Sequence, residues 1–161
     1  MRNAYGPAVP QRGLTRWADA PRRVRVVATA TVLLLGYGTV VHVVQLVAAG
    51  LDPYPGLPGW LRGYFVGLTV LDPLAAVLLA RARRSGVVLA VGVLVTDAAA
   101  NAWANLVIDA SPGLTPGRVG TAVITGLAVV LVAAARPLWR HAGAGLHDAR
   151  LDRVGGAGTD R

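Results

Sequence analysis

The stretch Val26–Ala49, VVATATVLLLGYGTVVHVVQLVAA, determines the fold class of this 161-residue chain. It contains no charged side chain, and it is longer than the about 20 residues with which an α-helix crosses about 30 Å of hydrocarbon. It is also longer than the apolar core of a cleaved signal peptide, which has about 7–15 residues. The stretch therefore predicts a transmembrane helix that is retained in the mature protein.

Three more segments are apolar and long enough to cross a bilayer. The first two each contain a single carboxyl, Asp72 and Asp97, while the third is uncharged. About 17–25 predominantly apolar residues suffice for one span. The pattern predicts an all-α, polytopic membrane protein whose transmembrane domain, residues 23–140, is a four-helix bundle. The four spans are expected at about residues 26–49, 63–80, 86–108 and 119–135.

The positive charge is distributed unevenly along the chain. The formal net charge is +8, although 54% of the residues are hydrophobic and the mean hydropathy is +0.52. All 16 basic residues are arginines, and only Arg62 and Arg118 flank the first and third connections between spans. Because cytoplasmic flanks retain arginine, both termini are expected in the cytoplasm, in a multi-pass protein of the plasma membrane.

This distribution also bears on the partners of the chain. The expected partners are the lipid bilayer and the anionic headgroups that cytoplasmic arginines attract. Nucleic-acid binding would need a folded basic surface, and the flanks show no such pattern. Nucleic acid is therefore not an expected partner.

The two ends of the chain differ in composition from the spans. Residues 1–22 and 141–161 are rich in Gly, Asp and Arg and contain few apolar side chains. Such segments bury too little apolar surface to offset the entropy of ordering. Both ends are predicted to be disordered cytoplasmic segments, of which the N-terminal one is Arg-rich.

Polar side chains inside the spans are the candidates for a functional site. An Asp at a helix centre costs about 2.5–3.5 kcal/mol on insertion scales, so an intramembrane carboxyl suggests a function. Asp97, Asn101 and Asn105 are four residues apart and share one helix face. The full set of candidate ligand-binding residues is His42, Gln45, Thr69, Asp72, Asp97, Asn101 and Asn105.

The helical rise places several of these residues at matching depths. His42 and Asn101 are at similar levels in the first and third spans, and Gln45 and Asn105 lie about one turn further out. Asp72 lies near the midplane. The sequence therefore permits a ladder of polar pairs from the outer interface to the centre of the bilayer.

The pair Asp72-Pro73 is the most specific local feature. Proline has no N–H and clashes with the carbonyl four residues earlier, so Pro73 is expected to bend or break the second span. Asp and Pro are favoured at the cap and first position of a helix. The sequence therefore suggests that Asp72 caps a half-helix that begins at Pro73.

Established catalytic and metal-binding motifs are absent. The chain has no Cys, and one His with two Asp is too small a ligand set for zinc. It contains no nucleotide-binding loop and no nucleophile–base pattern. We expect no metal and no cofactor, and the catalytic residues, if the chain is an enzyme, are unknown.

Three functions fit the pattern. The first is a binding or transport protein whose buried polar site, open to the outer half of the bilayer, takes a small amphipathic or cationic ligand. The second is a structural or accessory subunit in which polar residues serve only helix packing. The third is an acid–base enzyme acting on a lipid-like substrate. The small residues Gly63 and Gly67 also permit a homo-oligomer through close helix approach.

Overall fold

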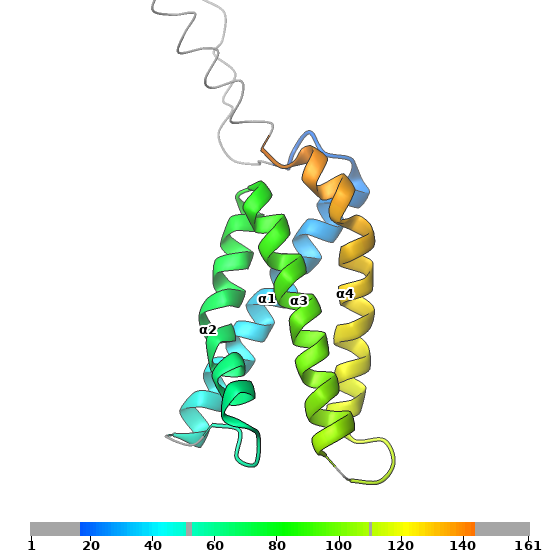
Figure 1. Cartoon of the computed structure of the whole chain (residues 1–161). Coiled ribbons are helices and arrows are strands. Elements are labelled where there is room, and N and C mark those ends of the chain that lie inside the picture. Colours follow the sequence, from blue (N-terminus) through cyan, green and yellow to red (C-terminus); the bar gives the residue numbers. More distant parts are fainter. Residues whose placement is uncertain (1–16, 51–52, 110, 144–161) are drawn as a thin grey trace, which may run out of the picture.

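The computed structural model describes residues 17–50, 53–109 and 111–143, all of them in helices or in the turns between helices (Figure 1). The elements are α1 (Arg22–Ala49), α2 (Gly59–Ala80), α3 (Arg84–Trp103), the π-helical turn η1 (Ala104–Ile108) that continues α3, and α4 (Pro116–His141). These residues contain no strand. The predicted all-α architecture with four long helices is confirmed.

Each helix is long and apolar enough to cross a membrane. Windows of 18 residues reach a mean hydropathy of 1.9 in α1, 1.8 in α2, 1.7 in α3 with η1, and 2.0 in α4. The helices begin earlier than the predicted spans, because α1 and α2 each follow a proline, Pro21 and Pro58. In α4, Pro116 occupies the first turn and the hydroxyl of Thr115 accepts a hydrogen bond from the backbone N–H of Arg118.

The predicted terminal segments are described only in part. Residues 1–16 and 144–161 lie outside the described residues. The disorder of residues 1–22 stays a prediction; within the described part of this segment, the indole Nε1 of Trp17 donates a hydrogen bond to the carbonyl of Leu79 at 3.0 Å. The backbone N–H of Gly143 likewise donates to the carbonyl of Ala82 at 2.8 Å.

These contacts define two unlike ends of the bundle. At the terminal end, Trp17 and Gly143 bind the turn between α2 and α3. The opposite end, here called the loop end, carries the α1–α2 and α3–α4 connections. Each helix packs extensively against the next along the chain, whereas the interface between α1 and α4 is much smaller. The buried residues of α1 all lie between Val24 and Leu35, in its first half. The bundle is therefore tightly packed at the terminal end and looser toward the loop end.

Pro73 does not break α2. The helix is continuous from Gly59 to Ala80 with Pro73 inside it, so the predicted half-helix is absent and Asp72 is not a cap. Pro73 removes one hydrogen bond of the helix, but α2 packs against both α1 and α3, which restrict the backbone on both sides. Tertiary packing therefore overrides the local preference for a break.

A close backbone approach between α2 and α3 involves Gly86 at the start of α3. A Cβ atom built at Gly86 would overlap the backbone of Leu78 and Leu79 in α2. Only a residue without a side chain fits there, because neighbouring backbone atoms cannot rotate away. Gly86 therefore sets how closely α2 and α3 meet at the terminal end.

Gly86→Ala is expected to lower the free energy of unfolding by about 1–3 kcal/mol, the range for overpacking a tight contact. The measurement is thermal unfolding of the purified protein in detergent. Gly92→Ala in the same helix is the matched control, because a Cβ at Gly92 meets nothing within 4 Å. The control should be neutral or stabilising by up to about 1 kcal/mol. Equal destabilisation by both variants would contradict the close contact.

Candidate functional site

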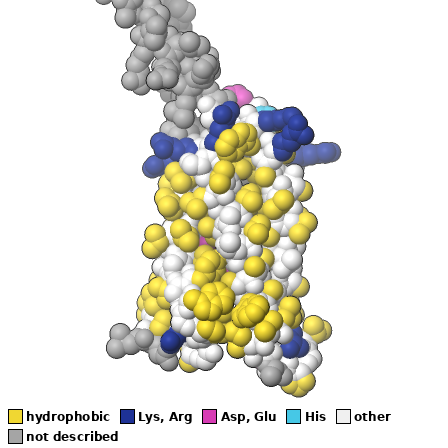
Figure 2. All heavy atoms as spheres, in the orientation of Figure 1, with side chains coloured by type: hydrophobic (Ala, Val, Ile, Leu, Met, Phe, Trp, Pro, Cys, Tyr) yellow, Lys and Arg dark blue, Asp and Glu magenta, His cyan; other side chains and the backbone are white. Residues whose placement is uncertain are grey.

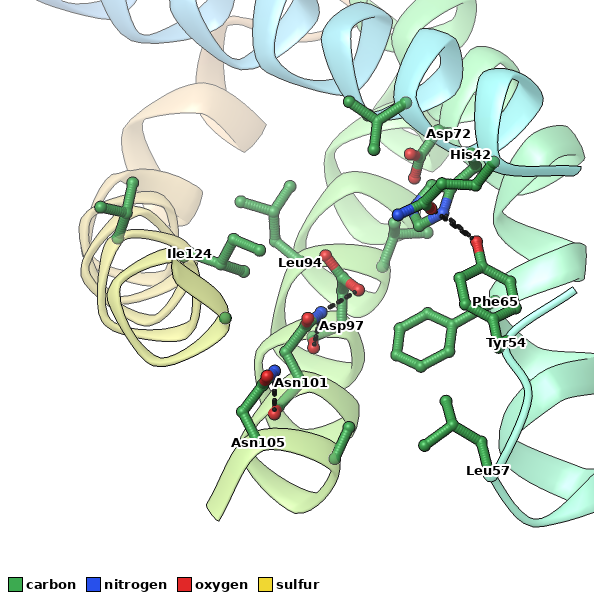
Figure 3. A pocket seen from close by; sticks show the side chains of 18 of the residues that line it. His42, Tyr54, Leu57, Phe65, Asp72, Leu94, Asp97, Asn101, Asn105 and Ile124 are labelled. Carbon is green, nitrogen blue, oxygen red and sulfur yellow. Dashed lines mark hydrogen bonds between the residues drawn. The ribbon is translucent and has the colours of Figure 1, made fainter. Parts of the chain in front are cut away.

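A cavity of about 800 Å³ lies between the four helices toward the loop end (Figure 3). Six of the seven candidate residues line it: His42, Gln45, Asp72, Asp97, Asn101 and Asn105. Thr69 does not, because its hydroxyl donates a hydrogen bond to the carbonyl of Val66 in its own helix at 2.7 Å. The structure thus brings together residues from three helices around one space and leaves Thr69 outside it.

Asp72 is the most buried ionisable residue of the cavity. Its side chain is only 5% exposed, and the carboxyl lies against the backbone of Gly38 in α1. A Cβ atom built at Gly38 would be 2.5 Å from Asp72 Oδ2, so glycine is needed for this approach. Within residues 17–50, 53–109 and 111–143, no group donates a hydrogen bond to the Asp72 carboxyl. Among the described residues no fully buried side-chain nitrogen or oxygen lacks a hydrogen-bond partner, so the carboxyl oxygens of Asp72, which have none, are accessible from the cavity.

The polar stripe of α3 is hydrogen-bonded within itself. Asn101 Nδ2 donates to Oδ1 of Asp97 at 2.8 Å and to its backbone carbonyl at 3.0 Å. Asn105 Nδ2 donates to the carbonyl of Asn101 at 2.9 Å and to Thr121 Oγ1 of α4 at 3.2 Å. The stripe predicted from the four-residue spacing is therefore present, and its last member ties α3 to α4.

The end of this stripe is fixed by Arg118. Its guanidinium donates to three backbone carbonyls, those of Asn105 at 3.2 Å, Asp109 at 3.4 Å and Gly113. A cation at the C-terminal end of a helix satisfies carbonyls that have no helical partner. Hydrogen bonding to Ser111, and to a lesser degree the charge of Arg118, lowers the pKa of Asp109 at the rim of the cavity.

Tyr54 is a site residue that the sequence analysis missed. Its hydroxyl donates to Gln45 Oε1 at 2.8 Å and lies 3.0 Å from His42 Nδ1. Its ring centroid is 5.1 Å from that of Phe65. The backbone of Tyr54 has φ 62°, a conformation that non-glycine residues rarely adopt and that is frequent at functional sites. The only sequence signal was its place between two prolines of a short connection.

The polar pairs that the sequence permits between α1 and α3 are not joined by direct hydrogen bonds among the described residues. In the described part of the chain, no hydrogen bond joins His42 to Asn101 or Gln45 to Asn105. Instead the α1 residues bind Tyr54, while the α3 residues bind one another. The two sets face each other across the cavity because α1 packs against α2 and diverges from α4 toward the loop end, as Figure 1 shows.

The cavity opens between α1 and α4. Every lining residue from α2, α3 and η1 is buried or half-buried. The exposed lining residues are Tyr37 and Gln45 of α1, Pro55 and Gly56 of the first connection, and Val123 and Leu127 of α4. Tyr37 and Leu127 lie near the middle of their helices. The opening therefore extends from the loop end along the side of the bundle.

No family model, curated protein or solved structure matches this chain. A set of three or more metal-ligating side chains is likewise not found among the described residues.

Tyr54→Phe is expected to lower the free energy of unfolding by about 0.5–1.5 kcal/mol, because it removes the hydrogen bonds of the hydroxyl to His42 and Gln45. Hydrogen exchange should also become faster at the amide of Leu57, which donates to the carbonyl of Tyr54 at 3.2 Å. Tyr37→Phe is the matched control, since that side chain is 68% exposed. If Tyr54→Phe behaved like the control, the hydroxyl would have no role in holding the first connection.

Proposed function

We propose that this protein is a membrane-embedded binding or transport protein whose cavity holds a small amphipathic cation. The observation that carries the proposal is the Asp72 carboxyl, which is 5% exposed, lines the cavity and has no hydrogen-bond partner among the described residues. A buried carboxyl that is unpaired in an apolar environment is costly. A ligand cation would supply the missing partner.

The charges around the cavity favour a cation over an anion. Three carboxyls line it, those of Asp72, Asp97 and Asp109, and none of its described lining residues is an arginine. The guanidinium of Arg118 is directed at backbone carbonyls. The cavity therefore has three carboxyls and no lining arginine or lysine among the described residues, which favours positive ligands.

The α4 side of the cavity favours a ligand with an apolar part. From α4 the lining consists of Gly117, Gly120, Val123, Ile124 and Leu127, without a charged or amide side chain. The opening beside these residues runs along the flank of the bundle, where a bilayer would surround it. An apolar tail directed toward α4 would remain in apolar surroundings while the cationic head met the carboxyls.

The orientation in the membrane is part of the proposal. Figure 2 shows basic side chains gathered at the terminal end of the molecule. Because arginine is retained on the cytoplasmic side, we place this end in the cytoplasm, next to anionic headgroups. The cavity then opens toward the outer half of the plasma membrane.

The orientation can be tested by cysteine labelling, because the chain contains no Cys. Ser111 lies in the α3–α4 connection and Ser85 in the first turn of α3, and both are exposed. A membrane-impermeant maleimide added to intact cells is expected to label Ser111→Cys, and to label Ser85→Cys only after lysis. The reverse pattern would place the termini outside.

The main alternative is an accessory subunit in which polar residues only hold helices together. Asn105 fits this interpretation, because it binds Thr121 across the α3–α4 interface. Asp72 does not fit it, because its carboxyl forms no hydrogen bond with another helix in the described structure.

Self-association through α2 also remains a prediction. A Cβ atom built at Gly63 or at Gly67 has no atom within 4 Å, which leaves this face of α2 accessible to a second copy of the chain.

Asp72→Asn is expected to weaken binding of 4-phenylbutylammonium at least about 10-fold, because it removes a charge-assisted contact worth about 1.5–3 kcal/mol. Binding is measured by calorimetry on protein in lipid nanodiscs, with empty nanodiscs subtracted. The anion 5-phenylpentanoate should not bind the unchanged protein. Without ligand, the variant should be at least as stable as the parent, because an unpaired buried charge is removed.

Asp19→Asn is the matched control, since Asp19 is exposed and does not line the cavity. A second variant keeps every charge: Gly38→Ala forces the Asp72 carboxyl to move and should also weaken binding. Gly36→Ala, whose Cβ meets nothing within 4 Å, should leave binding intact. If Asp72→Asn destabilises the bundle and the parent binds no cation, the accessory function is the correct one.

A further inference from the structure

The hydrogen-bonding capacity of the cavity narrows the class of ligand. Resting on the proposed function, we infer that the ligand is an ammonium that carries N–H groups, a primary or secondary amine, and not a quaternary ammonium. The reason is that side-chain donors in the interior of the cavity are bound to other protein groups, whereas several acceptors face the space unpaired.

The Tyr54 hydroxyl determines the tautomer of His42. A phenol has one hydrogen, and Tyr54 donates it to Gln45 Oε1 at 2.8 Å. The hydroxyl must therefore accept in its 3.0 Å contact with His42 Nδ1, so Nδ1 carries the hydrogen. A neutral imidazole has only one N–H, which leaves Nε2 as an acceptor. His42 thus presents an acceptor to the cavity.

Both side-chain N–H groups of Asn101 in α3 and of Asn105 in η1 are donated to other groups of the protein. Each side-chain amide has two hydrogens. Those of Asn101 are donated to the carbonyl and Oδ1 of Asp97, and those of Asn105 to the carbonyl of Asn101 and to Thr121 Oγ1. The hydroxyl of Thr121 in turn donates to the carbonyl of Gly117 at 2.9 Å. This network leaves no donor of the stripe for a ligand.

The acceptors that remain converge on the interior of the cavity. They are both carboxyl oxygens of Asp72, Oδ2 of Asp97, Nε2 of His42 and Oδ1 of Asn101, none of which receives a hydrogen bond from the described residues. Figure 3 shows these side chains directed at one space from α1, α2 and α3. The side-chain amide of Gln45 retains donors, but it lies at the exposed rim. A ligand in the interior therefore meets acceptors only.

Quaternary ammonium groups are recognised in a different way. They have no N–H and are bound by the faces of aromatic rings arranged as a cage. The aromatic rings away from the opening are those of Phe65 and Tyr54, which pack against each other at 5.1 Å between centroids, and His42 lies 6.1 Å from Phe65. Tyr37 is 68% exposed at the opening. A quaternary ligand would therefore leave the acceptors unpaired without gaining a cage.

The test compares four cations that share the 4-phenylbutyl tail. They are the primary ammonium and its N-methyl, N-isopropyl and N,N,N-trimethyl forms, each with a single positive charge at neutral pH. The N-isopropyl and N,N,N-trimethyl heads contain the same number of heavy atoms, but only the first keeps two N–H groups. Comparing this pair separates hydrogen bonding from size. Affinities are measured by calorimetry in nanodiscs, after subtraction of bilayer partitioning in empty nanodiscs.

The N-isopropyl cation is expected to bind about 10–100-fold more tightly than the N,N,N-trimethyl cation, because unpaired acceptors penalise a ligand that lacks donors. The primary and N-methyl cations should bind at least as tightly as the N-isopropyl form. Equal or tighter binding of the N,N,N-trimethyl cation would overturn the inference while leaving the proposed function standing. Binding of none of the four would overturn both.

His42→Ala tests the acceptor that the tautomer argument assigns. Because one acceptor is lost, the affinity ratio of the N-isopropyl to the N,N,N-trimethyl cation should fall several-fold. His141→Ala is the matched control, since His141 Nδ1 contacts the carbonyl of Pro137 at the far end of α4 and does not line the cavity. Thermal unfolding verifies that both variants are folded. An unchanged ratio in folded His42→Ala would overturn the role of Nε2.

Discussion

The close backbone contact between α2 and α3 is the constraint on which the rest of this structure depends. At Gly86 the two helices approach until no Cβ atom would fit. Trp17 and the C-terminal end of α4 bind the same hairpin through its backbone carbonyls. Because the helices are held together at the terminal end, any divergence between them increases toward the loop end. The cavity occupies the space that this divergence creates.

The same divergence explains how the polar residues are partnered. Amides and hydroxyls that lie on one helix, or on immediate neighbours, satisfy one another, as Asn101 does with Asp97 and Tyr54 does with Gln45. Asp72 lies where α1 approaches α2 at Gly38, with the open cavity on its other side. Side chains on facing walls are too far apart to bond directly. Hydrogen-bond acceptors in the interior of the cavity are therefore left without a partner from the described residues.

Tyr54 shows how a connection can complete a site built by helices. Its left-handed backbone turns the side chain toward His42 and Gln45, and its ring packs against Phe65. The strain of this conformation is offset by two hydrogen bonds and an aromatic contact. Arg118 has a corresponding role at the other connection, where it holds the carbonyls at the end of η1. Both connections thus fix polar groups at the rim of the cavity.

The sequence by itself determined the four apolar helices, the asymmetry of the arginines and the single face shared by Asp97, Asn101 and Asn105. These features depend on composition and on the helical period, which act within one segment. It did not determine that α2 continues through Pro73 or that Thr69 bonds within its own helix. Those outcomes depend on the neighbours that pack against α2.

Only the tertiary structure decided that the polar side chains at similar depths in α1 and α3 lie on opposite sides of a cavity and do not bond directly. It also decided that Tyr54 belongs to the site. The helical period fixes the direction in which a side chain points but not the distance to the next helix. That distance is set by a few close contacts, such as those of Gly38 and Gly86. Because a helix is rigid, a close contact at one point also determines the distance between two helices further along their length. The cavity, its opening between α1 and α4, and the tautomer of His42 all follow from those distances.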